Sequence, residues 1–114
     1  MQNLKQSWIA MLLMLMGMAP AGNRPAETGV AIQLFQFQPD TLVVPAGTRV
    51  TWTNRDDIEH TVTAGMGDQA DGRFAGSLAA KGAVFSFTFE RPGDYAYFCD
   101  RHHFMRGTVR VTQP

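Results

Sequence analysis

Cysteine is almost absent from this chain, whose 114 residues contain only one, Cys99. A single cysteine excludes an intramolecular disulfide and therefore a disulfide-stapled fold. An excess of charge of one sign is also lacking, because ten Lys and Arg residues balance ten Asp and Glu residues. This balance gives no case for binding nucleic acid or an anionic membrane surface. No stretch keeps a helical period and no segment repeats, which argues against helical and repeat architectures.

Long apolar runs are missing too. The longest, from Trp8 to Met18, is shorter than the roughly 20 residues that a membrane-spanning helix needs. It follows Lys5 and precedes Ala19-Pro20-Ala21, a small-x-small cleavage pattern, so residues 1–21 are predicted to be a secretory signal peptide. An uncleaved anchor is the alternative. Cleavage would leave a periplasmic protein with no membrane span.

The mature chain divides into a short lead and one small domain. Residues 22–29 are polar and contain a proline, which predicts a flexible lead. Residues 30–114 alternate apolar and polar side chains, and turn signals separate the runs every 8–12 residues or so. The strand-like runs are 30–37, 41–44, 49–53, 58–63, 84–89, 95–98 and 108–111; 65–72 reads as a loop and 74–81 is ambiguous. About eight short strands predict an all-β, Greek-key β-sandwich.

The most distinctive chemistry lies between two of these runs. Cys99, His102 and Met105 place a thiol, an imidazole and a thioether on one short loop. Two His and one Cys with a weak axial Met form a blue-copper electron-transfer site. The fourth ligand must then come from elsewhere, and His60 is the only histidine outside the loop. A metal ligand would also explain a lone thiol in an exported protein.

The loop resembles that of a known family. Cys99-Asp100-Arg101-His102-His103-Phe104-Met105, followed by Arg-Gly-x-Val-x-Val, resembles the ligand loop of the cupredoxins, the type 1 blue-copper proteins. Its short spacing is most similar to amicyanin among the plastocyanin-like members. The segment Val43 to Asn54, followed by Glu59-His60-Thr61-Val62, resembles the strand and first-histidine segment of the same family.

This resemblance implies a cupredoxin-like copper-binding domain. One type 1 copper ion would be held by His60, Cys99, His102 and Met105. The function implied is that of a monomeric, amicyanin-like periplasmic electron carrier, shuttling single electrons between redox proteins such as a dehydrogenase donor and a cytochrome c acceptor. Because the protein fills all four coordination positions, no position is open for a substrate, and the chain is not expected to be an enzyme.

Alternatives exist for each ligand. Cys99 could be a small buried hydrophobe, or a nucleophile paired with His, although no oxyanion donors are evident beside it. The family spacing selects His102, and His103 is interpreted as a solvated loop residue. Met66 competes with Met105 as a soft ligand. Zinc could take the cysteine and three histidines, but His60 lacks the paired spacing of structural zinc sites.

Two other functions also remain open. A periplasmic copper chaperone or storage protein would exchange its metal through exposed Met- or His-rich segments, which the sequence lacks after residue 21. A redox-silent interaction module would have the same sandwich without a blue site.

Departures from the family surround the proposed ligands. Glu59 and Arg101 stand where relatives often have proline, and Thr61 stands where Asn is common. The Thr61 hydroxyl is predicted to donate to the Asp100 carboxylate and so to tie the two ligand segments together.

The surface at His102 is predicted to be the electron port. Phe104 is the expected apolar frame of its ring, with Ala64, Met66 and the Pro45-Ala46 turn as further candidates. Positive side chains on the same loop would steer a partner that carries acidic residues.

Overall fold

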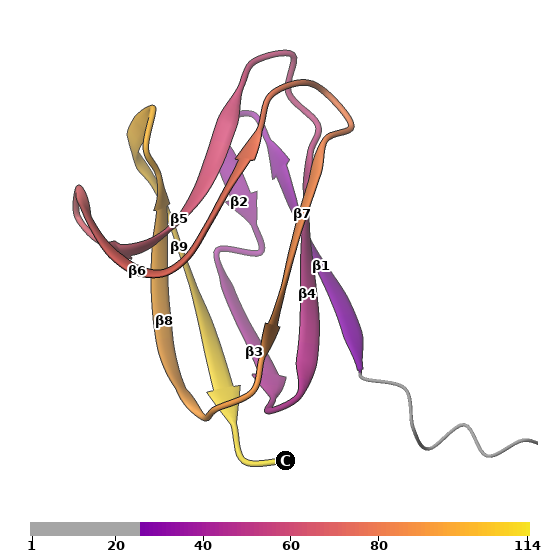
Figure 1. Cartoon of the computed structure of the whole chain (residues 1–114). Helices are drawn as coiled ribbons and strands as arrows, with labels where there is room; N and C mark the ends of the chain where they lie inside the picture. The colour runs from indigo at the N-terminus through magenta and orange to yellow at the C-terminus, as the bar shows by residue number, and fades with distance from the viewer. Residues whose placement is uncertain (1–25) are drawn as a thin grey trace, which may run out of the picture.

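Residues 26–114 are described by a computed structural model and form a two-layer β-sandwich (Figure 1). One sheet has the strand order β2-β1-β4-β7 and the other β3-β9-β8-β5-β6. The strands described are β1 (Glu27–Gln33), β2 (Gln36–Gln38), β3 (Thr41–Pro45), β4 (Thr48–Asn54), β5 (His60–Met66), β6 (Gln69–Leu78), β7 (Val84–Phe89), β8 (Gly93–Cys99) and β9 (His102–Thr112). Over this range no helix is long and apolar enough to cross a membrane. The predicted signal peptide, residues 1–21, lies outside the described residues.

The connections confirm the Greek-key sandwich. Hairpins pair β5 with β6 and β8 with β9, whereas β1 pairs in parallel with β4, and β3 in parallel with β9. Two parallel neighbours cannot be joined by a hairpin, so the chain passes through the other sheet before it returns to pair in parallel. The described chain has nine strands, close to the eight or so expected.

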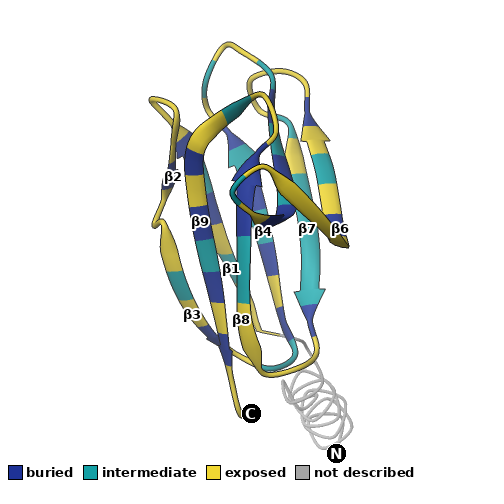
Figure 2. Ribbon diagram, turned by 90° about the vertical axis from the view of Figure 1, so that its left-hand side faces the viewer, coloured by how far each residue is buried: buried dark blue, intermediate teal, exposed yellow. Residues whose placement is uncertain are grey.

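The core fills the space between the two sheets. Trp52 on β4 is fully buried, and its ring lies against those of Phe85, Phe89 and Tyr97. Burial alternates along the strands, as the blue and yellow bands of β9 show in Figure 2. On β9 the inward positions include Met105, Val109 and Val111. The methionine therefore belongs to the packed face of its strand.

The period-two run 30–37 is not one continuous strand. It folds back at Leu34 and Phe35, so that Gln33 pairs with Gln36 in the β1–β2 hairpin. Both turn residues have positive φ angles, 54° and 57°. Such two-residue turns usually contain Asn or Gly, and neither residue is present here to mark the turn.

Two other segments differ from expectation. The predicted lead 22–29 was wrong at its end, because residues 27–29 belong to β1, where Glu27 pairs with Arg49. The ambiguous segment 74–81 is mostly strand: β6 starts earlier, at Gln69, and pairs with β5 through Leu78. Its exposed positions hide the alternation that would have identified it.

Candidate metal centre

Three strand ends bring the candidate ligands together. His60 begins β5, Cys99 ends β8 and His102 begins β9, and β8 lies between the other two strands in the sheet. The Sγ atom of Cys99 is 3.7 Å from Nδ1 of His60 and 3.7 Å from Nδ1 of His102. All three donor atoms lie within 4.8 Å of one another. A metal bound at roughly 2.0 Å from nitrogen and roughly 2.3 Å from sulfur spans such separations, so this donor set fits one ion.

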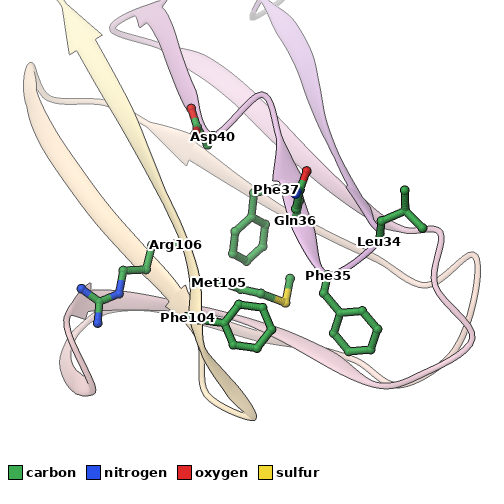
Figure 3. A pocket seen from close by; sticks show the side chains of 8 residues that line it. All are labelled: Leu34, Phe35, Gln36, Phe37, Asp40, Phe104, Met105 and Arg106. Carbon is green, nitrogen blue, oxygen red and sulfur yellow. The ribbon is translucent and has the colours of Figure 1, made fainter.

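Burial distinguishes the candidates. His60 and Cys99 are fully buried, Met105 is 2% exposed and His102 is half-buried. The competing methionine, Met66, is 77% exposed and ends β5, the strand that begins at His60. Figure 3 shows the Met105 side chain among Phe104, Phe37 and Phe35 on the wall of a cavity of about 380 Å³. Met105 is thus the methionine held near the cluster.

The fourth possible ligand, His103, points elsewhere. Its side chain is half exposed, its ring lies edge-on to Phe98, and its Nε2 is 3.7 Å from the Asp100 carboxylate. The three-residue cluster does not include it. A zinc site of one cysteine and three histidines therefore finds no support in this arrangement.

Asp56 contacts the candidate ligand His60 on the side of the ring opposite Cys99. Its Oδ2 atom is 2.8 Å from Nε2 of His60, on the side of the ring away from Cys99. The same carboxylate accepts hydrogen bonds from the backbone N–H groups of Leu34 at 2.8 Å and Phe35 at 3.0 Å. A carboxylate that orients a metal-binding histidine is a common supporting contact in metal sites.

These contacts keep the Asp56 carboxyl group ionised. Partial burial alone would raise the pKa of Asp56, but the hydrogen bonds from Phe35, His60 and Leu34 outweigh it and lower that pKa. The carboxylate therefore stays ionised near neutral pH and can only accept hydrogen bonds. Nε2 of His60 therefore donates to this carboxylate, and Nδ1 is the ring nitrogen that faces Cys99.

The loop that carries Asp56 is held by Asn54. This side chain is fully buried and donates to the carbonyl groups of Ile58 at 2.8 Å and Leu78 at 3.1 Å. Its Oδ1 accepts the N–H of Asp56 at 2.9 Å. These hydrogen bonds hold a turn after β4 that directs the Asp56 carboxylate toward His60.

Thr61 links the two ligand segments, but not in the way predicted. Its hydroxyl accepts the backbone N–H of Asp100 at 2.7 Å, rather than donating to the Asp100 carboxylate, which lies near His103 instead. A second contact runs from the Thr61 N–H to Sγ of Cys99 at 3.4 Å. The Thr61 hydroxyl also lies 3.0 Å from the hydroxyl of Thr63.

Phe35 and Asp56 are the site residues that sequence reasoning missed. The Phe35 ring lies edge-on to both histidines, with centroids 5.3 Å from His60 and 5.0 Å from His102. No short-range pattern marks Phe35, because its placement depends on the unmarked hairpin turn. A carboxylate four residues before a candidate histidine was a usable signal for Asp56.

The chain resembles known copper proteins over most of its described length. Residues 25–112 match the family model described as copper binding proteins, plastocyanin/azurin family. The amicyanin-alpha of Methylorubrum extorquens is 36% identical over 93 residues, covering 82% of this chain and 75% of the relative.

Two solved structures share the fold. A purple cupredoxin from Nitrosopumilus maritimus superposes with a TM-score of 0.69 at 28% identity, covering 75% of this chain and 99% of that one. A reduced amicyanin variant superposes with a TM-score of 0.68 at 32% identity, covering 82% and 90%.

The Asp56 contacts predict a measurable loss of stability. Asp56→Asn removes the charge that accepts three hydrogen bonds, and one amide oxygen cannot replace both carboxylate oxygens. We expect the free energy of unfolding of the metal-free protein to fall by about 1–3 kcal/mol, measured by urea denaturation. Asp57→Asn is the matched control, because the Asp57 side chain is 91% exposed, and its effect should stay below about 0.5 kcal/mol. Equal effects of the two changes would contradict the assignment.

Proposed function

Because the chain belongs to the plastocyanin/azurin family of copper-binding proteins, we propose that it is a type 1 copper electron carrier. His60, Cys99 and His102 would hold the copper, with Met105 as a weak axial ligand. The observation that carries this proposal is the convergence of two Nδ1 atoms on one buried thiol. Soft sulfur and imidazole donors in a set of this kind suit copper.

The chain's own residues would keep these donors still. When bound, copper supplies a reversible one-electron change between its Cu(II) and Cu(I) states. Asp56 orients the His60 ring, the Thr61 N–H faces the sulfur of Cys99, and Met105 is fixed by core packing. Donors that are held in place move little when the charge of the site changes, and this favours fast electron transfer.

The arrangement favours a carrier over an enzyme. His60 and Cys99 are fully sealed from solvent, and Phe35 covers one side of both histidine rings. A catalytic metal site keeps a position open for water or substrate. We propose that this site keeps none and that its chemistry is outer-sphere electron transfer.

The route for electrons would run through His102. Its half-buried ring lies near Phe35, at 5.0 Å between centroids, and near Phe104, at 6.2 Å. Phe104 is 72% exposed, and exposed Leu34 and Ile58 extend the apolar surface. These four residues, Leu34, Phe35, Ile58 and Phe104, form what we call the apolar rim.

The apolar rim replaces most of the frame expected from the sequence. Ala64 is fully buried, and Met66 lies at the end of β5 away from His60. The Pro45-Ala46 turn lies against Thr112, at the end of β9 opposite His102. Of the expected residues, Phe104 alone is placed beside the histidine ring.

The partners would be redox proteins, such as a dehydrogenase donor and a cytochrome acceptor in the periplasm. The periplasmic location rests on the prediction that residues 1–21 are a signal peptide. Recovery of the protein from the periplasmic fraction, with residues 1–21 removed, would test this prediction. Arg101 and His103 each have an acidic neighbour, Glu59 and Asp100. We therefore expect apolar contact, more than positive charge, to dominate docking at the rim.

Copper addition to the purified protein, compared with Cys99→Ser, is the direct test of the proposal. The wild-type protein should develop intense absorption of red light, because charge transfer from a thiolate to copper is strong. The serine variant should lose that band, since a hydroxyl cannot supply it. A band that survives in the variant, or copper binding without any band in the wild type, would overturn the blue site and favour a chaperone or storage role.

Met105→Leu tests the axial ligand. Leucine keeps the volume and apolar character of the buried side chain, so the fold should be retained. The thioether donates weakly to Cu(II), and its loss should raise the reduction potential while copper stays bound. A redox titration measures the shift. Met66→Leu, at an exposed position, should leave the potential unchanged, and the opposite pattern would assign the axial role to Met66.

Phe104→Glu tests the port. A carboxylate beside His102 makes docking of two identical copies repulsive, so electron self-exchange should slow by about tenfold or more, while the optical spectrum stays nearly unchanged. NMR line broadening in mixtures of oxidised and reduced protein measures this rate. Val43→Glu is the control, because exposed Val43 pairs with Arg110, far along β9 from His102. If both variants slow exchange equally, the port lies elsewhere.

A further inference from the structure

An ion pair joins the residues that immediately precede the two candidate histidine ligands. The Nη1 atom of Arg101, just before His102, lies 2.5 Å from Oε1 of Glu59, just before His60. The two partners are 42 positions apart in the chain. The pair therefore links the start of β5 to the connection between β8 and β9, the two segments that must keep a fixed separation.

The Glu59 side of this link is anchored in the sheet. Its second carboxylate oxygen, Oε2, accepts the hydroxyl of Ser77 on β6 at 3.1 Å. Ser77 is the cross-strand partner of Thr61. The Glu59 side chain is 32% exposed and that of Arg101 58% exposed, so Glu59 is the more buried partner of the pair.

A second contact, nearer the core, already joins the same two segments. The Thr61 hydroxyl accepts the N–H of Asp100, which holds the residue after Cys99. That contact holds Asp100 and does not reach Arg101, the residue between it and His102. The Glu59–Arg101 pair holds Arg101 itself, from the exposed side of the two segments. The two contacts thus restrain two successive residues, Asp100 and Arg101, between the candidate ligands Cys99 and His102.

We propose that Glu59 and Arg101 form a strap that positions His102 against His60 and Cys99. The strap rests on the proposed copper site, since it is the separation of these ligands that it holds. Glu59 and Arg101 are positioning residues and touch no reacting atom. As an exposed ion pair, the strap has a modest strength and is weakened by salt.

A purely electrostatic role makes a different prediction. Removing the positive charge of Arg101 and removing the negative charge of Glu59 would then shift the properties of the site in opposite directions. A strap is broken equally by either change, so both variants must shift loop mobility in the same direction. The double variant must be no worse than either single variant, because there is only one contact to lose.

The experiment compares Glu59→Gln, Arg101→Gln and the double variant by two readouts. The first is amide hydrogen exchange at residues 101–103 of the metal-free protein. The second is the rate at which a chelator removes copper from the loaded protein. We expect each single variant to accelerate both by about two- to fivefold, and the double variant to match the single ones. Arg101→Lys, which keeps the ion pair, should stay close to the wild type.

A second exposed ion pair, between β8 and β9, supplies the control. Arg110 on β9 and Asp94 on β8 are 3.0 Å apart, with side chains 56% and 60% exposed, at the end away from the ligands. Arg110→Gln should alter neither readout. High salt should accelerate loop exchange in the wild-type protein and leave Arg101→Gln unchanged.

The outcomes separate the strap from the proposed function. Opposite shifts in the two single variants, additive effects in the double variant, or no change in loop exchange would overturn the strap. A wild-type protein without a blue band would instead overturn the copper assignment. The metal-free exchange data would still decide in that case whether the two histidine segments are coupled through Glu59 and Arg101.

Discussion

The carboxylate of Asp56 is the constraint on which the site depends. It binds three donors from two separate parts of the chain: the ligand histidine and the N–H groups of Leu34 and Phe35. The positive φ angles of those turn residues are unfavourable for non-glycine side chains, and the ionised carboxylate offsets the cost. One group thus sets the tautomer of His60 and places the Phe35 ring over both histidines.

Exposure is distributed unequally around the ligands. His60 and Cys99 are sealed between the sheets, whereas His102 reaches the surface through the apolar rim. A buried thiol is protected from oxidants, and a partly exposed imidazole shortens the path to another protein. The sandwich achieves this asymmetry by taking two candidate ligands from the buried ends of β5 and β8 and one from the half-buried start of β9. Protection and access therefore do not compete for the same residue.

Sequence reasoning could predict what depends on short-range pattern. Alternating strands such as 84–89 and the spacing of Cys99, His102 and Met105 are local signals, and both led to the sandwich and the candidate ligands. The hairpin at Leu34 was missed because tertiary contacts, not turn residues, hold it. The partner of Arg101 was equally hidden, since charged residues 42 positions apart carry no local sign of contact. The contact of the Thr61 hydroxyl with the Asp100 N–H, rather than with the Asp100 carboxylate, depends on how the folded chain places these two segments.

The direction of the strands also determines how the molecule can be attached to something else. β1 runs toward the hairpin beside His102, and β9 runs away from His102 to the carboxyl terminus, so both ends of the described chain lie at the pole opposite the ligands (Figure 1). With β9 alone 11 residues long, the two poles are about 35 Å apart. A tether fused to either end, to an electrode or to a second domain, would leave the proposed electron port at His102 facing outward. An attachment at this pole would therefore leave the apolar rim free to contact a redox partner.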